Sequence, residues 1–121
     1  MLAMGALAVV EVWDASLRAG DWTRARSVLA DDASYVDADG VTTCTTGDEI
    51  VELMRSFKGE LPDVDVVEWH ETGDHVVARL RQPAWGEDSD WYQVLTVRDL
   101  YVVRLADHPT AEAAEAAAGS A

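Results

Sequence analysis

A change of hydrophobic period near Pro62 limits the fold of this chain more than any other feature. Before this point, apolar residues recur at steps of three and four, which is the spacing of one face of a helix. After it, apolar and polar residues alternate, as in strands with one buried face. Helical segments followed by several antiparallel strands are typical of an α+β fold. We therefore predict that helices cover one face of a curved sheet and leave a hollow suited to a ligand.

Local signals place the boundaries of these elements. Gly20 is a stop signal for the first helix, and Asp21 is a cap for the second. Thr46 and Glu49 form a capping box at the start of the third helix. The predicted helices cover residues 3–19, 21–30, 46–59 and 109–118. The predicted strands cover residues 33–38, 41–44, 64–71, 75–82, 90–98 and 101–107.

Charge and composition exclude several classes of function. The chain has 121 residues and a net charge of -14, and Lys58 is its single lysine. Nucleic acids and anionic membranes require clustered basic residues, so we expect neither as a partner. The run of apolar residues needed to span a bilayer is missing. Cys44 stands alone, which favours a reducing, cytoplasmic location, and the three dispersed histidines predict no metal site.

The run from Leu29 to Gly40 contains the first candidate for a functional carboxylate. Tyr35 and Asp37 lie two residues apart in a predicted strand, so their side chains share a face. If that face lines the hollow, Asp37 is a carboxylate among apolar groups and its pKa is raised. The alternative is a turn residue whose carboxylate is satisfied by backbone N–H groups near Gly40.

Aromatic residues mark the walls of the predicted hollow. Trp91 and Gln93 share a strand face with Leu95 and Val97, which directs all four toward the helices. Aromatic walls around few polar groups suit a flat or cyclic apolar ligand. The chain has five tryptophans, and ordinary core packing would explain most of these rings equally well.

Five further residues allow more than one interpretation. Asp107 is either a buried acid/base or a cap for the last helix. Arg79 and Arg81 alternate with apolar residues. If they face the hollow, they form an anion site for a carboxylate substrate. We expect them to point away from it, into a dimer contact, because burying two guanidinium groups without partners is costly. Trp69 and His70 are neighbours in one strand, and alternation does not decide which of them faces the helices.

Five short motifs or single residues occur along the chain in a characteristic order. They are Ala19-Gly20-Asp21, Leu29–Ala33, Asp37 with Gly40, Gly47, and Gly73-Asp74. Their order and spacing resemble the nuclear-transport-factor-2-like (NTF2-like) superfamily, which includes ketosteroid isomerase, SnoaL-type polyketide cyclases and limonene-epoxide hydrolase. The resemblance implies three N-terminal helices packed on a strongly curved, mainly antiparallel sheet. That sheet would form a cone (a cystatin-like α+β barrel) followed by a short C-terminal helix. The resemblance also implies a single domain over residues 1–121 and a homodimer.

The resemblance assigns roles to particular residues. Asp37 falls where ketosteroid isomerase keeps its proton-shuttling carboxylate, and Asp107 where the SnoaL-type cyclases keep an acid/base. Trp13 and Gln93 fall at the positions of the isomerase's oxyanion hole and offer neutral N–H donors. Arg81 stands where the epoxide hydrolases carry an aspartate, so their water-activating pair of carboxylates is not expected here.

Together these observations predict a cofactor-independent cyclase or isomerase that acts on a small apolar carbonyl compound. Asp37 and Asp107 are the predicted catalytic residues, working by carboxylate proton transfer. The residues predicted to bind the substrate are Trp13, Tyr35, Met54, Trp91 and Gln93. The alternatives are a non-catalytic small-molecule binding module with the same pocket, and an interaction domain that dimerises through an exposed sheet face.

Overall fold

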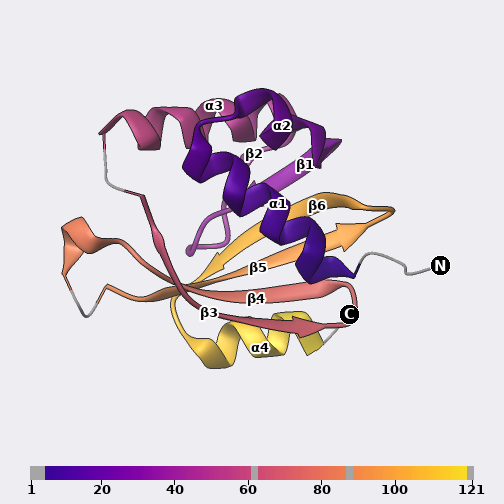
Figure 1. The fold of residues 1–121 in the computed structure, drawn as a ribbon. Helices are drawn as coiled ribbons and strands as arrows, with labels where there is room; N and C mark the ends of the chain where they lie inside the picture. Colours follow the sequence, from indigo (N-terminus) through magenta and orange to yellow (C-terminus); the bar gives the residue numbers. More distant parts are fainter. Residues whose placement is uncertain (1–4, 61–62, 87–88, 120–121) are drawn as a thin grey trace.

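The computed structural model describes residues 5–60, 63–86 and 89–119, which form an α+β fold (Figure 1). Among these residues, no helix has the length and apolar character needed to cross a membrane. The elements in chain order are α1 (Ala6–Ala19), α2 (Trp22–Ser27), β1 (Leu29–Val36), β2 (Thr42–Cys44), α3 (Gly47–Glu60), β3 (Asp65–Thr72), β4 (His75–Arg81), the 3-10 turn η1 (Pro83–Trp85), β5 (Trp91–Arg98), β6 (Tyr101–His108) and α4 (Ala111–Gly119).

The helix ends use the signals expected from the sequence. Gly20 follows α1 with φ of 68°, a left-handed conformation that glycine adopts without steric cost. The Asp21 side chain accepts a hydrogen bond from the Arg24 backbone N–H at 3.1 Å and so caps α2. At the start of α3, the Thr46 hydroxyl accepts from the Glu49 N–H at 3.1 Å, and Glu49 reaches back to the Thr45 N–H at 2.9 Å.

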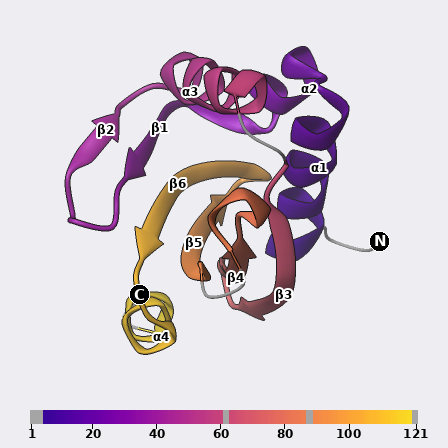
Figure 2. The ribbon, with the colours of Figure 1, turned by 90° about the vertical axis from the view of Figure 1, so that its left-hand side faces the viewer.

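The sheet has six strands in the order β2-β1-β6-β5-β4-β3. Strands β3 to β6 form an antiparallel meander, whereas β1 pairs with β6 in parallel and with β2 in antiparallel orientation. The sheet is therefore mixed, and the expected meander accounts for only part of it. β2 and β3 remain as edges, so the sheet bends strongly but does not close into the barrel that the sequence predicted (Figure 2).

The predicted boundaries of the second helix and the first strand are wrong, and the strand also ends at Val36 instead of Ala38. The second helix ends at Ser27, and the first strand begins at Leu29 instead of Ala33. Leu29 pairs with Val102 of β6, and the Val102 N–H donates to the Val28 carbonyl oxygen at 2.8 Å. This long-range pairing overrides a local pattern that resembles a helix. The third helix also follows the β1–β2 hairpin, so only two helices precede the sheet in the chain.

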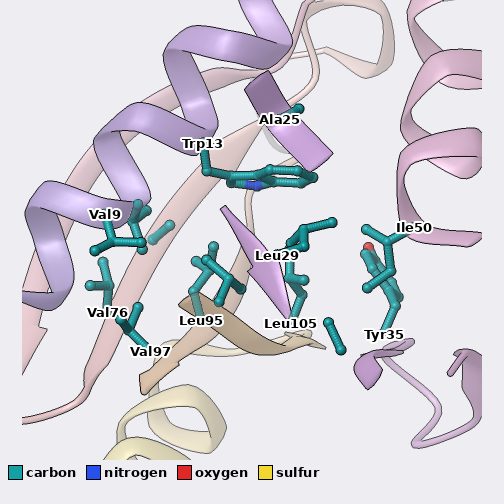
Figure 3. Packing of buried hydrophobic residues seen from close by; sticks show 14 of the residues in the cluster. Val9, Trp13, Ala25, Leu29, Tyr35, Ile50, Val76, Leu95, Val97 and Leu105 are labelled. Carbon is teal, nitrogen blue, oxygen red and sulfur yellow. The ribbon is translucent and has the colours of Figure 1, made fainter. Parts of the chain in front are cut away.

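The helices divide between the two faces of the sheet. Helices α1, α2 and α3 lie over one face, and α4 lies against the other (Figure 1). The main core forms under the first three helices, where the Trp13 ring lies close to Leu29 (Figure 3). A smaller cluster joins α4 to β4 and β5 and consists of Val77, Val94, Ala114 and Ala118. The main core therefore lies on the face of the sheet that is covered by α1 to α3, and a hollow beneath these helices would lie on the same face.

Candidate functional site

A cavity of about 430 Å³ lies between the sheet and helices α1 to α3. All five tryptophans of the chain and its single phenylalanine line this cavity. The tryptophans are Trp13, Trp22, Trp69, Trp85 and Trp91. Aromatic and aliphatic side chains form most of the wall, and the described polar groups gather at two places. These are the sheet around Asp107 and a partly exposed rim that we call the mouth.

The polar group on the sheet consists of three residues from adjacent strands, which we call the Asp107 cluster. Asp107 lies on β6, and Gln93 lies directly opposite it on β5. The Gln93 side-chain N–H donates to Asp107 Oδ1 at 2.9 Å, and the Tyr35 hydroxyl from β1 donates to Oδ2 in a short hydrogen bond. Strand register brings the cluster together, because β6 lies between β1 and β5 in the sheet.

Burial governs the electrostatics of this cluster. Burial raises the pKa of Asp107, because the charged form loses contact with water. Hydrogen bonds from Tyr35, Gln93 and Trp91, and the nearby His108, lower that pKa and offset part of the rise. Burial and the Asp107 charge also raise the pKa of Tyr35, so its phenol remains a hydrogen-bond donor. Asp107 is thus a more basic carboxylate than one in water, held by neutral donors.

Asp37 occupies a different environment. β1 ends at Val36, and the Asp37 side chain turns into the following hairpin loop, where Oδ1 accepts from the N–H groups of Asp39 at 2.9 Å and Val41 at 3.0 Å. Ala38 lines the cavity, but Asp37 does not. The geometry agrees with the alternative in which Asp37 is a turn residue, and the structure does not bring the two predicted catalytic carboxylates together in the cavity wall.

The five residues predicted to bind the substrate all lie on the cavity wall; they are Trp13, Tyr35, Met54, Trp91 and Gln93. Trp13 is only 3% exposed and belongs to the core as well as to the wall. The Gln93 N–H was expected to face a ligand oxygen, but it is bonded to Asp107. Contact between these residues and a ligand therefore stays a prediction.

The mouth combines exposed aromatic rings with paired charges. Phe57 and Trp85 are 46% and 61% exposed, which is unusual for rings that line a cavity. Trp85 lies on η1 and contacts Trp91 with ring centroids 5.6 Å apart. Four charged side chains form two ion pairs beside these rings, namely Arg18 with Asp14 at 2.9 Å and Lys58 with Asp63 at 2.8 Å.

Sequence reasoning could not place Trp69, and the structure shows why. β3 contains an irregularity between Val66 and Glu68, where the register with β4 shifts. Strict alternation would put Val66 and Trp69 on opposite faces, yet both line the cavity together with Val64. A bulge in an edge strand leaves no clear mark in a single sequence, so alternation alone could not decide between Trp69 and His70.

Arg79 and Arg81 lie on the strand face opposite the cavity, as expected, since Ala78 and Leu80 line it. Both arginines bind Asp90, with Nε to carboxylate oxygen distances of 2.7 and 2.6 Å. These guanidinium groups thus have a carboxylate partner within the chain, and the dimer contact stays a prediction. Among the residues that the structure describes, no three His, Cys, Asp or Glu side chains gather in a way that could hold a metal ion.

Comparison with known proteins identifies the family. A family profile described as a SnoaL-like domain matches residues 8–107. No curated protein matches the sequence.

Several solved structures are similar in fold. An uncharacterised cystatin-fold protein from Novosphingobium aromaticivorans has a TM-score of 0.71 and 15% identity, and the match covers 87% of this chain and 98% of that one. A candidate polyketide cyclase from Sinorhizobium meliloti has a TM-score of 0.70 and 17% identity, with 83% and 93% covered. A protein with a ketosteroid isomerase-like fold from Catenulispora acidiphila, in complex with trimethylamine, has a TM-score of 0.63 and 20% identity, with 92% of both chains covered.

These identities are low, so each similarity concerns the fold. The fold includes proteins that bind small ligands, as the trimethylamine complex illustrates. The neighbours and the profile together confirm the resemblance to the NTF2-like superfamily that the sequence suggested. The chain belongs to the SnoaL-like domain family within that superfamily.

Proposed function

We propose that this protein is a cofactor-independent enzyme of the isomerase or cyclase type, which moves a proton at a carbon next to the carbonyl group of a small apolar compound. The observation that carries the proposal is the placement of Asp107 as a half-buried carboxylate on the wall of an aromatic cavity. Burial raises its pKa, which brings its basicity closer to what abstraction of a proton from carbon requires. A structural neighbour described as a candidate polyketide cyclase supports chemistry of this type, and the fold alone does not decide the activity.

In the proposed step, Asp107 takes a proton from the carbon next to the carbonyl group. The electron pair of the broken C–H bond moves onto the carbonyl oxygen and forms an enolate. Protonation of Asp107 weakens its attraction for the Tyr35 O–H and the Gln93 N–H, which then become available to the enolate oxygen. If the substrate carries a C=C bond conjugated with the enolate, the resulting dienolate is reprotonated at its far carbon, as in an isomerase. Otherwise the enolate attacks a second carbonyl carbon, as in a cyclase, and the new alkoxide oxygen takes up the proton. Asp107 returns the proton in both cases.

Asp37 has no part in this proposal. Its carboxylate is occupied by two backbone N–H groups of the turn and does not line the cavity. Asp37 therefore provides a matched control, because it is a second aspartate at the end of the neighbouring strand and allows the same Asp→Asn change.

Exchange of carbon-bound hydrogen for deuterium tests the proposal without knowledge of the natural substrate. β-Tetralone is an apolar bicyclic ketone, and its loss of α-hydrogen in D₂O can be followed by NMR with the wild type and two variants. We expect the wild type to accelerate exchange and Asp107→Asn to slow it about 100-fold, as for the loss of a general base. We expect Asp37→Asn to stay within about twofold of the wild type, since Asn keeps the turn acceptor. If the Asp107→Asn variant exchanges hydrogen for deuterium as fast as the wild type, the proposal is contradicted.

A non-catalytic binding module is the second candidate, and one observation favours it. Both oxygens of Asp107 already accept hydrogen bonds, so the carboxylate is satisfied before any substrate arrives. This candidate predicts that β-tetralone binds without accelerated exchange. Quenching of tryptophan fluorescence measures the binding directly, because all five tryptophans line the cavity.

A further inference from the structure

The charges around the cavity do not balance. Five charged side chains of the described residues line it, and four of them pair with each other at the mouth. The two mouth cations are also bonded to backbone carbonyl oxygens, Arg18 to that of Val64 at 2.7 Å and Lys58 to that of Arg18 at 3.0 Å. Each of the two cations is thus matched by a carboxylate of the chain itself. The remaining charge is that of Asp107.

Asp107 lacks a cationic partner inside the cavity. Its hydrogen-bond donors, Tyr35 and Gln93, are neutral, and no described Lys, Arg or His forms an ion pair with it. His108 is a basic side chain whose charge lowers the pKa of Asp107. His108 is the next residue of β6, where successive side chains point to opposite faces of the sheet. The cavity wall thus contains a carboxylate with neutral donors, and no described cation forms an ion pair with it.

The rest of the cavity wall also favours positive charge. The face of an aromatic ring is negative, and it attracts an ammonium group within about 6 Å of the ring centre. Tyr35, Trp69 and Trp91 line the same cavity as Asp107, and Trp91 belongs to its hydrogen-bond environment. The whole chain has a net charge of -14, which raises the local concentration of cations and lowers that of anions.

We propose that the cavity selects organic cations, so that its ligand combines an apolar body with a protonated or quaternary nitrogen placed near Asp107. A neutral ligand of the same shape leaves the buried carboxylate without a counter-charge, and an anionic ligand adds repulsion. The inference rests on the cavity of the proposed function but not on turnover, because it concerns only which ligands bind.

A pair of ligands that differ only in charge tests the inference. Benzyldimethyl(hydroxyethyl)ammonium has a carbon isostere in which a quaternary carbon replaces the nitrogen, and phenylpropionate serves as an anion of similar size. Affinities are measured at pH 8 by quenching of tryptophan fluorescence. We expect the cation to bind about tenfold more tightly than its isostere, as one ion-pair or cation–π contact would give, and phenylpropionate to bind most weakly.

Variants locate the source of the preference. Asp107→Asn should reduce the ratio of the two affinities to about threefold or less, because only the ring faces then distinguish the ligands. Asp32→Asn is the control, since it removes the same charge from an exposed position outside the cavity, and it should leave the ratio unchanged.

Acidification of the wild type provides a measurement that needs no variant. Protonation of Asp107 should weaken binding of the cation and leave binding of the isostere constant.

Several results would overturn the inference. These are an isostere or phenylpropionate that binds as tightly as the cation, a tenfold preference that persists in Asp107→Asn, and a preference that does not change with pH. The outcome is independent of the exchange experiment. Exchange of β-tetralone without a preference for the cation refutes the inference alone, and a preference without exchange refutes the proposed catalysis alone.

Discussion

Two aspartates near the ends of neighbouring strands have different surroundings. Val36 of β1 pairs in parallel with Ala106 of β6; Asp37 follows the last residue of β1, and Asp107 is the last residue but one of β6. Backbone N–H groups satisfy Asp37, whereas the side chains of Tyr35 and Gln93 satisfy Asp107. Two aspartates at nearly equivalent positions thus have different roles. Asp37 stabilises the turn after β1, and Asp107 of β6 lines the cavity.

The difference follows from where each strand stops. At Asp37 the chain has already entered the hairpin turn, since the Asp37 N–H donates to the Val41 carbonyl oxygen and its own carbonyl accepts from Gly40, both at 2.9 Å. Gly40 has φ of 81°, which the tight turn requires. β6 continues through Asp107 to His108, so Asp107 keeps the alternation that directs Leu105 into the cavity. A carboxylate therefore joins the cavity wall only where the strand continues past it.

After Asp107→Asn, the largest effect is expected from removing the Tyr35 hydroxyl that donates to Asp107. Tyr35→Phe should slow deuterium exchange at least about tenfold, because a hydrogen bond to a charged group contributes about 1.5–3 kcal/mol. The Tyr35 hydrogen bond lowers the pKa of Asp107, so its loss raises that pKa further. The acidic limb of the pH–rate profile should then move to higher pH. If the acidic limb of the profile does not move, Tyr35 does not influence the pKa of the general base.

Tyr92→Phe is the matched control for this experiment. It removes the same hydroxyl group from a residue of β5 that packs against the cluster under α4, on the face away from the cavity. Its exchange rate and pH profile should equal those of the wild type.

A smaller effect, and one on stability, is expected at the other strand end. Asp37→Ala removes the acceptor of two backbone hydrogen bonds and should lower the free energy of unfolding by about 1–2 kcal/mol, measured by urea denaturation. Asp37→Asn retains an oxygen acceptor and should stay within about 0.5 kcal/mol of the wild type. Equal stability of the Ala variant and the wild type would show that Asp37 does not hold the turn.

The smallest effect is expected in the pH dependence of stability. Burial raises the pKa of folded Asp107 above its ordinary value of 3.8, so folding favours the protonated form. The wild type should lose stability relative to Asp107→Asn as pH rises from that ordinary value through the raised one. The Tyr35 and Gln93 hydrogen bonds offset part of this loss. Thermal denaturation of both proteins across this range measures it, and a relative loss on acidification would contradict the sign.

Local patterns in the sequence predicted much of the fold. The switch of period, the stop at Gly20 and the capping box at Thr46 depend on neighbours a few residues away, so they could be found in the sequence. The alternation of Trp91, Gln93 and Leu95 also predicted the wall of the cavity. The start of β1 at Leu29 was missed because it depends on pairing with Val102, far along the chain.

The candidate site could be predicted only in part for the same reason. Asp107 was a candidate from its place in the sequence, but Tyr35 and Gln93 become its donors only through the order of strands β1, β6 and β5. Trp69 was undecided because an irregularity in β3 resets the alternation. Asp37 had two interpretations, and the position of the strand end distinguishes them geometrically.

The amino-acid sequence by itself determined the class of fold and the excess of negative charge, because periodicity and composition act locally or over the whole chain. Tertiary structure alone decided that the sheet stays open, that β1 and β6 run in parallel, and that Asp107 lines the cavity while Asp37 closes a turn. The physical reason is that the surroundings of a carboxylate depend on which donors reach it, and strands distant in sequence supply the donors of Asp107.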